Sequence, residues 1–360
     1  MTRQKRPSSA VRAIEGGASF RSRQEESYCS AANNSILTTD AIDRLNRHPL
    51  HQLHLRTRSK QQAMAEYTPD EKLFERLRDK VIVLTGRASG IGAATVRLLD
   101  EHKAHVVFGD VNASAAYDNV VQHSSTATFV QCDVTKYEEF YRLFKTAYAK
   151  HGRIDHAISC AGIFEQGNCF DPGLTVDSVG EDPGNTQTMD VNVMGTLHCS
   201  RIAAVFPRET IQKGGNKSLV LLSSVNAFRE SPGLFLLYQI YKHAIHGLLR
   251  SSRKTLFERD GIRVNAVCPG VTNIPMAAHV ARPFREQGLS VPKPEQVAKI
   301  IVGLEVDESI QDKAFYIEGG GAWEFEDGFV REQPRWLGEK PTRRMRVNSE
   351  AVQKGALVPK

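Results

Sequence analysis

The chain has 360 residues, of which 41% are hydrophobic and 24% charged, the balance of a globular protein. This composition excludes collagen-like, wholly disordered and disulfide-scaffold proteins. Because no uncharged apolar run approaches the roughly 18 to 20 residues of a membrane helix, we expect no membrane span. The six cysteines are scattered, without a Cys-x-x-Cys pair or a histidine at zinc-finger spacing. We therefore expect no metal site and a reducing compartment.

The formal net charge of +6 is unevenly distributed along the chain. Residues 1–63 carry 11 basic and 5 acidic side chains, and residues 331–360 carry 8 and 3. The remaining residues, 64–330, hold 28 basic and 33 acidic side chains. The basic character belongs to the two ends, and neither end shows a folded basic motif with interleaved aromatic residues. We expect no nucleic-acid partner.

Residues 1–63 are rich in Ser, Thr, Asn, Gln, Arg and His and lack apolar periodicity, which predicts a disordered basic extension. Its five acidic residues argue against a mitochondrial presequence, so a cytoplasmic location is expected. Met64 opens a segment more typical of a domain start. A misassigned start codon upstream of it is one hypothesis.

From Lys80 onward, short buried strands alternate with helical patterns. The expected strands are Val81–Leu84, His105–Phe108, Thr128–Gln131, His156–Ser159, Ser218–Leu222, Arg263–Val267 and Ala314–Ile317. The expected helices are Gly90–Glu101, Ala113–Gln122, Lys136–Lys150, Asn185–Phe206, Tyr238–Glu258 and Pro294–Leu304. This alternation predicts a doubly wound α/β fold with a parallel sheet of about seven strands. We expect one domain over residues 64–330 and a basic tail, or a clasp across a neighbour, over 331–360.

A glycine-rich turn joins the first expected strand to the first helix. It reads Thr85-Gly86-Arg87-Ala88-Ser89-Gly90-Ile91-Gly92. Glycines there let backbone amides approach a pyrophosphate at the positive end of the helix. The strand, turn and helix context favours a dinucleotide site over a turn kept only for packing.

Two acidic residues follow the next strands. Asp110 ends the second strand, where its carboxylate can accept hydrogen bonds from the adenosine ribose and repel a 2′-phosphate. Asp133, followed by Val134, is placed to hold the adenine, although capping of the next helix explains Asp133 as well. Asp110 favours NAD, and the cation of Arg87 leaves NADP open.

Tyr238 and Lys242 open a long predicted helix. A spacing of four places the phenol and the ammonium on one helix face. The ammonium is expected to lower the phenol pKa, which is about 10 in water, and to make Tyr238 a general base. In isolation such a pair is more often a packed tyrosine with a snorkelling lysine. Tyr241 is expected to point to a different face.

Taken together, these motifs resemble the short-chain dehydrogenase/reductase family over about 250 residues, from Lys80 to about Asp327. The resemblance rests on the glycine turn, Asp110, Asp133, Ala161-Gly162, Asn192-Val-Met-Gly195, Ser223-Ser224, Tyr238-x-x-x-Lys242 and Arg263-Val-Asn-Ala-Val-Cys-Pro269-Gly270, in that order.

The resemblance implies a Rossmann-type fold and a catalytic tetrad of Asn192, Ser224, Tyr238 and Lys242. Lys242 would also bind the nicotinamide ribose, and Asn192 would hold a relay water. It further implies an NAD(P)-dependent alcohol dehydrogenase or ketone reductase that forms a homodimer or homotetramer. The expected cofactor-binding residues are Thr85, Gly86, Ser89, Gly90, Ile91, Gly92, Asp110, Asp133, Val134, Ala161, Gly162, Tyr238, Lys242, Pro269, Gly270 and Thr272.

Four positions depart from the family pattern. Ser224 precedes Tyr238 by fourteen positions, one more than the family usually shows, which predicts a displaced serine. Ser159-Cys160 replaces an asparagine pair, Ile274 replaces a threonine for which Thr272 can substitute, and Arg87 replaces a small residue. These departures motivate an alternative, a catalytically decayed dinucleotide-binding regulatory or scaffold protein.

The substrate side is defined by apolar residues. Phe228, Leu234, Phe235 and Leu236 lie between the serine and the tyrosine, and residues 274–284 follow the sixth strand. Lids and pocket walls occupy these places in such folds. We expect a bulky hydrophobic alcohol or ketone, such as a steroid, terpenoid or polyketide, although a lid that packs only on its own domain explains the pattern equally well.

Overall fold

The computed structural model describes residues 66–86, 89–113, 122, 124–212, 214–231 and 236–353. The predicted N-terminal extension, 1–63, and most of the helix predicted at 113–122 lie outside these ranges. The described residues all belong to the unit Met64–Lys360.

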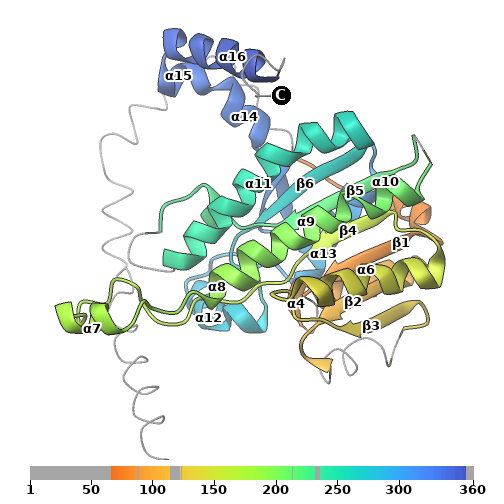
Figure 1. Ribbon diagram of the computed structural model, residues 1–360, viewed down its shortest axis with the longest axis horizontal. Coiled ribbons are helices and arrows are strands. Elements are labelled where there is room, and N and C mark those ends of the chain that lie inside the picture. Colours follow the sequence, from red (N-terminus) through yellow and green to blue (C-terminus); the bar gives the residue numbers. More distant parts are fainter. Residues whose placement is uncertain are drawn as a thin grey trace, which may run out of the picture. The chain divides into compact units, whose positions relative to one another are not determined.

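Eight strands form a single sheet in the order β3-β2-β1-β4-β5-β6-β7-β8 (Figure 1). Strands β1 to β7 run parallel, and β8 pairs antiparallel with β7. The bounds are β1 Val81–Thr85, β2 His105–Asp110, β3 Ala127–Gln131, β4 His156–Ser159, β5 Lys217–Leu222, β6 Ile262–Pro269, β7 Ala314–Glu318 and β8 Gly321–Glu324. The predicted doubly wound fold is confirmed. The predicted strand number was one too low, because β8 has only four residues and follows two glycines.

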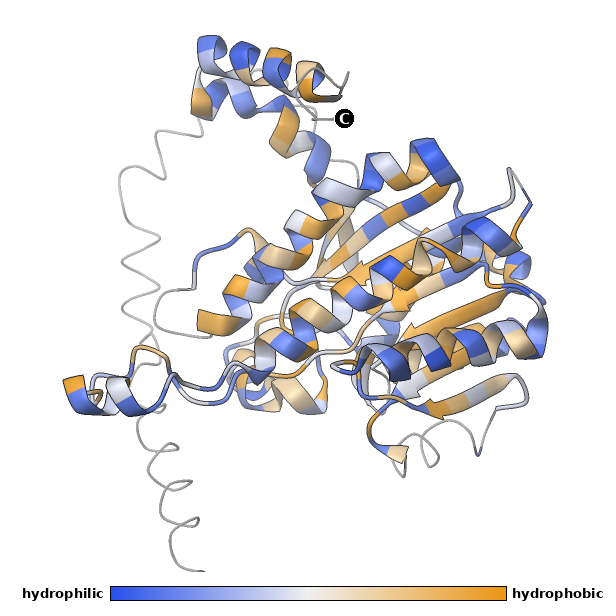
Figure 2. Cartoon of the chain, in the orientation of Figure 1, coloured by the Kyte–Doolittle hydropathy of each residue, from blue (hydrophilic) through white to orange (hydrophobic). Residues whose placement is uncertain are grey.

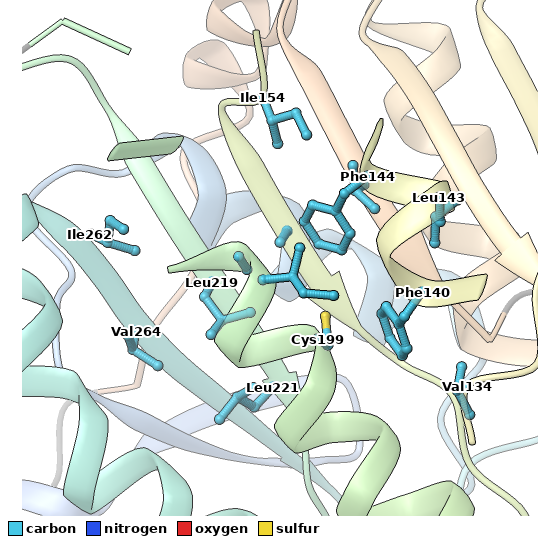
Figure 3. Packing of buried hydrophobic residues seen from close by; sticks show 14 of the residues in the cluster. Val134, Phe140, Leu143, Phe144, Ile154, Cys199, Leu219, Leu221, Ile262 and Val264 are labelled. Atoms are coloured by element: carbon cyan, nitrogen blue, oxygen red, sulfur yellow. The ribbon is translucent and has the colours of Figure 1, made fainter. Parts of the chain in front are cut away.

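Helices cover both faces of the sheet, which is why every residue of β1, β4 and β6 is buried. Alternate strand residues face opposite sides. Ile82 and Leu84 pack in the core cluster that includes α4 (Gly90–Glu101) and α13 (Pro294–Val306). Val81 and Val83 pack in the cluster that includes α6 (Tyr137–His151), α9 (Gly195–Ala203) and α11 (Leu236–Asp260), part of which is drawn in Figure 3. Figure 2 shows the resulting hydrophobic strands between amphipathic helices.

The remaining helices follow in chain order. They are η1 Glu71–Leu77, α6 Tyr137–His151, α7 Val176–Glu181, α8 Gln187–Met189, the π-helix η3 Asp190–Met194, α9 Gly195–Ala203, α10 Phe206–Thr210, η4 Val225–Ala227, α11 Leu236–Asp260, η5 Pro275–Ala277, α12 Ala278–Glu286, α14 Glu326–Arg331, α15 Gln333–Leu337 and α16 Glu339–Gln353. Helix α6 shows why such segments begin and end where they do. Glu138 and Glu139 occupy its first turn, and Gly152 ends it with a left-handed φ of 71°.

Two predicted boundaries need correction. The helix predicted over Asn185–Phe206 runs from Gln187 to Ala203 with the π-helical turn η3 between α8 and α9, where the backbone widens by one residue, and it ends before α10. The expected C-terminal tail contains two helices, α15 and α16. Sequence periodicity also missed α7 and α12.

The strand order changes direction beside β1, which pairs with β2 on one side and β4 on the other. In open α/β sheets, ligands bind beyond the carboxyl ends of the strands at such a switch point. The predicted site residues follow β1, β2, β3, β4, β5 and β6 at that edge.

Candidate active site

The turn after β1 brings two backbone segments unusually close. Gly86 has a φ of 76°, and a Cβ there would lie 2.1 Å from Cα of Ala161, which follows β4. Gly90 has a φ of 62°, and its missing Cβ leaves space against the Ile274 side chain, 3.1 Å away. Only glycine satisfies both the positive φ and the close approach. Arg87 lies outside the described residues.

Unused hydrogen-bond donors gather at this turn. Ser89 precedes α4 in an extended conformation but forms no side-chain capping bond, and the first turn of α4, which includes Ile91 and Gly92, contains no acidic residue. The Thr85 hydroxyl is buried without a hydrogen-bond partner among the described atoms. A helix N-terminus left uncapped beside an orphaned hydroxyl fits an anionic diphosphate.

Asp110 and Asp133 are placed at the same edge but differ in surroundings. Asp110 ends β2 half-buried, and its carboxylate accepts a hydrogen bond from the Asn112 N–H at 3.0 Å. The Asp133 carboxylate accepts bonds from the Thr135 N–H (3.0 Å) and hydroxyl (2.7 Å), and the bond from the Thr135 side chain is the main cause of its lowered pKa. Val134 is buried against Gly195. The Asp133 carboxylate therefore stabilises its own turn and does not cap α6, whose N-cap residue is Lys136.

Asn192 lies in the π-helical turn η3 and is buried. Both polar atoms of its side-chain amide bond one residue: Oδ1 accepts from the Ile163 N–H and Nδ2 donates to the Ile163 carbonyl, both at 2.8 Å. A Cβ at Gly162 would lie 3.2 Å from the same Oδ1. The Asn192 side chain thus fixes the loop after β4.

Ser224 and Tyr238 lie together despite the longer connection between them. Ser224 follows β5, and its hydroxyl forms a hydrogen bond with the Tyr238 phenol. The same hydroxyl accepts the Asn226 N–H at 3.2 Å. The extra residue in the connection therefore does not separate the Ser224 and Tyr238 side chains, and the displacement considered from the sequence is not found.

Tyr241 also contacts Tyr238, contrary to expectation. The two ring centroids are 4.8 Å apart at 71°, and the hydroxyls form a hydrogen bond. Residues three apart on a helix are neighbours, as residues four apart are. The prediction that Tyr241 points elsewhere overlooked this second spacing.

Lys242 is buried beside both rings. Its Nζ lies 5.6 Å from the Tyr238 centroid and 5.0 Å from the Tyr241 centroid, and it donates to the Leu222 carbonyl at 2.9 Å. Burial lowers the pKa of the Lys242 ammonium to about 8. Burial also raises the pKa of Tyr238, against the smaller lowering effect of hydrogen bonds from Ser224 and Tyr241. The expected lowering of the Tyr238 pKa by Lys242 is therefore wrong for this structure.

Comparison with known proteins agrees with this geometry. The family model for short chain dehydrogenases matches residues 80–283. The chain is 34% identical to short-chain dehydrogenase reductase 3c of Arabidopsis thaliana over 68% of its own length and 95% of that relative. The chain belongs to the short-chain dehydrogenase/reductase family.

Further relatives fit the same placement. A 5′-hydroxyaverantin dehydrogenase of Dothistroma septosporum is 26% identical over 72% of the chain and 92% of that relative. The fold resembles that of a 3-ketoacyl-(acyl-carrier-protein) reductase from Brucella melitensis, solved with NADH, with a TM-score of 0.60 and 22% identity over 68% of the chain and 98% of that structure. As a member of this oxidoreductase family, the protein has an NAD(P)-binding Rossmann fold.

The other short-chain dehydrogenase/reductase positions lie as follows. Pro269 ends β6, Gly270 follows it, and the buried Thr272 hydroxyl donates to the Gly270 carbonyl at 3.3 Å. At the substituted asparagine pair, the Ser159 hydroxyl donates to the Thr196 hydroxyl of α9 at 3.4 Å, and Cys160 is buried. A different polar link thus joins β4 to the helix layer.

Sequence reasoning missed three residues around Tyr238. The Phe164 ring stacks on the Tyr238 ring (5.1 Å, 21°), and His279 of α12 meets Phe164 edge-on at 5.3 Å. The Glu165 carboxylate accepts the Tyr238 N–H at 2.8 Å, capping the first turn of α11 from 73 residues away. A carboxylate near a helix N-terminus is a recognisable signal, but only when the two segments are known to meet.

The predicted substrate wall is partly relocated. The segment 274–284 forms η5 and most of α12, which reaches Tyr238 through Phe164. Phe228 packs instead on Phe325 and Tyr316, at 4.4 and 5.9 Å. Leu234 and Phe235 lie outside the described residues. No helix among the described residues is long and apolar enough to cross a membrane, and none of their His, Cys, Asp and Glu side chains forms a group of three placed to hold a metal ion.

Proposed function

We propose that the protein is an NAD-dependent oxidoreductase that interconverts a secondary alcohol and a ketone, with Asn192, Ser224, Tyr238 and Lys242 as its catalytic residues. The observation that carries this proposal is the placement of the Tyr238 phenol beside the Ser224 and Tyr241 hydroxyls and the buried Lys242 ammonium. In that arrangement the oxygen of the Tyr238 phenol is the atom that holds the proton to be transferred.

Each residue has a role in proton transfer. Tyr238 gives its proton to the carbonyl oxygen in reduction and takes it back in oxidation. Ser224 hydrogen-bonds the substrate oxygen and fixes its position beside Tyr238. Lys242 orients the tyrosine and binds the nicotinamide ribose, while Asn192 holds the loop after β4 and a relay water. When bound, the nicotinamide supplies or accepts the hydride.

The cofactor would lie along the carboxyl edge of the sheet. Its diphosphate would meet the amides between Gly86 and Gly92, and Asp110 would hold the ribose hydroxyls and so favour NAD over NADP. The residues that would hold it are Thr85, Gly86, Ser89, Gly90, Ile91, Gly92, Asp110, Asp133, Val134, Ala161, Gly162, Pro269, Gly270 and Thr272, with Tyr238 and Lys242.

The raised pKa of Tyr238 favours reduction at neutral pH. A phenol with a raised pKa keeps its proton and acts as an acid toward a ketone. Oxidation requires the phenolate, so its rate should rise with pH while the reduction rate does not.

A hydrophobic substrate is supported by the rings around the phenol. Phe164 stacks on Tyr238, and α12 closes over it through His279. One relative is named for dehydrogenating 5′-hydroxyaverantin. We therefore propose a bulky hydrophobic ketone or alcohol.

Assembly and compartment complete the proposal. Exposed Met194, Leu197 and Ile240 lie on η3, α9 and α11, the helices through which the family pairs its subunits. We propose a homodimer or homotetramer located in the cytoplasm.

The test is a ketone panel with matched tyrosine variants. Purified protein is given NADH or NADPH and hydrophobic ketones, and the loss of reduced nicotinamide is followed by absorbance. Tyr238→Phe should lower kcat/KM by about a thousandfold or more, whereas Tyr241→Phe should keep at least roughly a tenth of the activity at its optimal pH.

Two results would contradict the proposal. Measurable NADH binding without turnover of any ketone or alcohol would favour the decayed, regulatory alternative. Activity that survives Tyr238→Phe but is lost in Tyr241→Phe would show that Tyr241, and not Tyr238, transfers the proton.

A further inference from the structure

One exposed segment of the chain, residues 165–186, is acidic throughout. This acidic arm contains five carboxylates and no Lys, Arg or His. Helix α7, within this arm, buries no residue. Apolar side chains of the arm face solvent: Phe170, which precedes α7, is 75% exposed, and Val176 of α7 is 92% exposed. None of its carboxylates forms an ion pair within the described part of the chain.

A second exposed segment has the opposite charge. Helices α15 and α16, the basic helices, contain five Lys and Arg residues against two Glu residues over 333–353. Large apolar side chains are exposed here too, including Trp336, Met345 and Val347. In the described structure, Lys340, Arg343, Arg344 and Arg346 are not paired with any carboxylate.

Both segments are anchored on the same helix, α11. The acidic arm begins at Glu165, which accepts the Tyr238 N–H, and the basic helices follow α14, whose buried Glu326 accepts bonds from His246 and Arg250. Twelve residues separate Tyr238 from Arg250, about 18 Å along the helix. No hydrogen bond, ion pair or ring contact joins the two segments among the described residues.

We propose that the acidic arm of one copy docks on the basic helices of a second copy of this chain. Opposite charges attract across such a contact, and the exposed apolar residues on both sides leave water when it forms. Because each copy carries both segments, a two-fold pair would form the contact twice. The contact is independent of the catalytic proposal.

Charge-reversed variants test the pairing. The first variant is Arg343→Glu, Arg344→Glu and Arg346→Glu; the second is Asp171→Lys, Asp177→Lys and Glu181→Lys. In each variant, residues 165–186 and residues 333–353 then carry net charges of the same sign. Self-association measured by sedimentation velocity should weaken about tenfold in each variant, and wild-type association should weaken between about 0.05 and 0.5 M salt.

Mixing the variants gives the decisive measurement. An equimolar mixture restores both complementary pairs, so association should return to within about threefold of wild type. Unchanged thermal unfolding midpoints confirm that each variant folds. Association that is unaffected in the single variants, or not restored in the mixture, overturns the proposal. Loss of wild-type binding to phosphatidylserine vesicles in the first variant, with association unchanged, would assign the basic helices to a membrane surface instead.

Discussion

The two edges of the parallel sheet both hold buried polar side chains, but these side chains differ in how many hydrogen-bond partners they have. At the amino edge, His156, Ser218 and Arg263 occupy neighbouring positions of β4, β5 and β6. At the carboxyl edge, Ser224, Tyr238 and Lys242 meet. The contrast lies in how completely each set is satisfied.

At the amino edge, the Arg263 guanidinium has many partners. It donates to the carbonyls of Leu304, Glu305, Asp307 and Ile310 and to the Asn216 side chain, at 2.7 to 3.1 Å. Oε2 of the Glu305 carboxylate accepts from Ser218 and lies 2.9 Å from His156, whereas the buried Oε1 has no hydrogen-bond partner among the described residues. A buried guanidinium with this many hydrogen bonds fixes the structure around it.

The carboxyl edge leaves its charge incompletely paired. Within the described structure, the Lys242 ammonium donates to the Leu222 carbonyl and lies beside the rings of Tyr238 and Tyr241. Burial consequently lowers its pKa to about 8. The difference is that the buried cation of the amino edge has many hydrogen-bond partners, whereas Lys242 has no carboxylate partner in the described structure, which is why the carboxyl edge is the one proposed to transfer protons.

Removing the Arg263 guanidinium should have the largest effect on the free energy of unfolding. Arg263→Met removes five hydrogen bonds donated by a buried guanidinium and should lower the free energy of unfolding by about 3–5 kcal/mol. Chemical denaturation measures this change. Arg282→Met on the exposed face of α12 is the matched control and should leave the denaturation midpoint unchanged. If the two variants behaved alike, the amino edge would not be the structural one.

Removing the Lys242 ammonium should change the free energy of unfolding in the opposite direction. Lys242→Met should stabilise the fold at pH 7 by about 1–3 kcal/mol, because a lysine with a lowered pKa is buried at a cost of about 1.4 kcal/mol per pKa unit, and should lower kcat about a hundredfold. The native state binds fewer protons than the unfolded state above pH 8. Wild-type stability should therefore rise between pH 8 and about 10.4, narrowing the gap to the variant.

Denaturation at several pH values, together with kinetics, checks the lysine prediction. If Lys242→Met were less stable than wild type at pH 7, Lys242 would be a structural residue, as Arg263 is at the amino edge.

The smallest effect is expected at Tyr241. Tyr241→Phe keeps the ring but removes a hydrogen bond that lowers the Tyr238 pKa, so that pKa should rise further. At fixed pH near 8 the oxidation rate should fall about threefold to tenfold, and its pH profile should move to higher pH. A tyrosine that only fills the core would leave the pH profile where it is.

Much of this arrangement could be predicted from the sequence. Continuous apolar runs identified seven strands, and the motif order placed Ser224, Tyr238 and Lys242 at one edge. Contacts between distant segments could not be predicted: Glu165 caps α11 from 73 positions away, and Phe164 stacks on Tyr238 without any local signal. The π-helical turn at 190–194 was also hidden, because apolar periodicity does not register one widened turn.

The anchoring of α11 has a consequence for how this chain tolerates change. The helix is positioned by buried Tyr241, Ile245 and Leu249 and by the Glu326 contacts with His246 and Arg250. None of these contacts comes from residues 225–231, the described part of the connection that follows Ser224. Its length can therefore drift by a residue without moving the phenol, which leaves the wall beside the substrate open to evolutionary or engineered redesign.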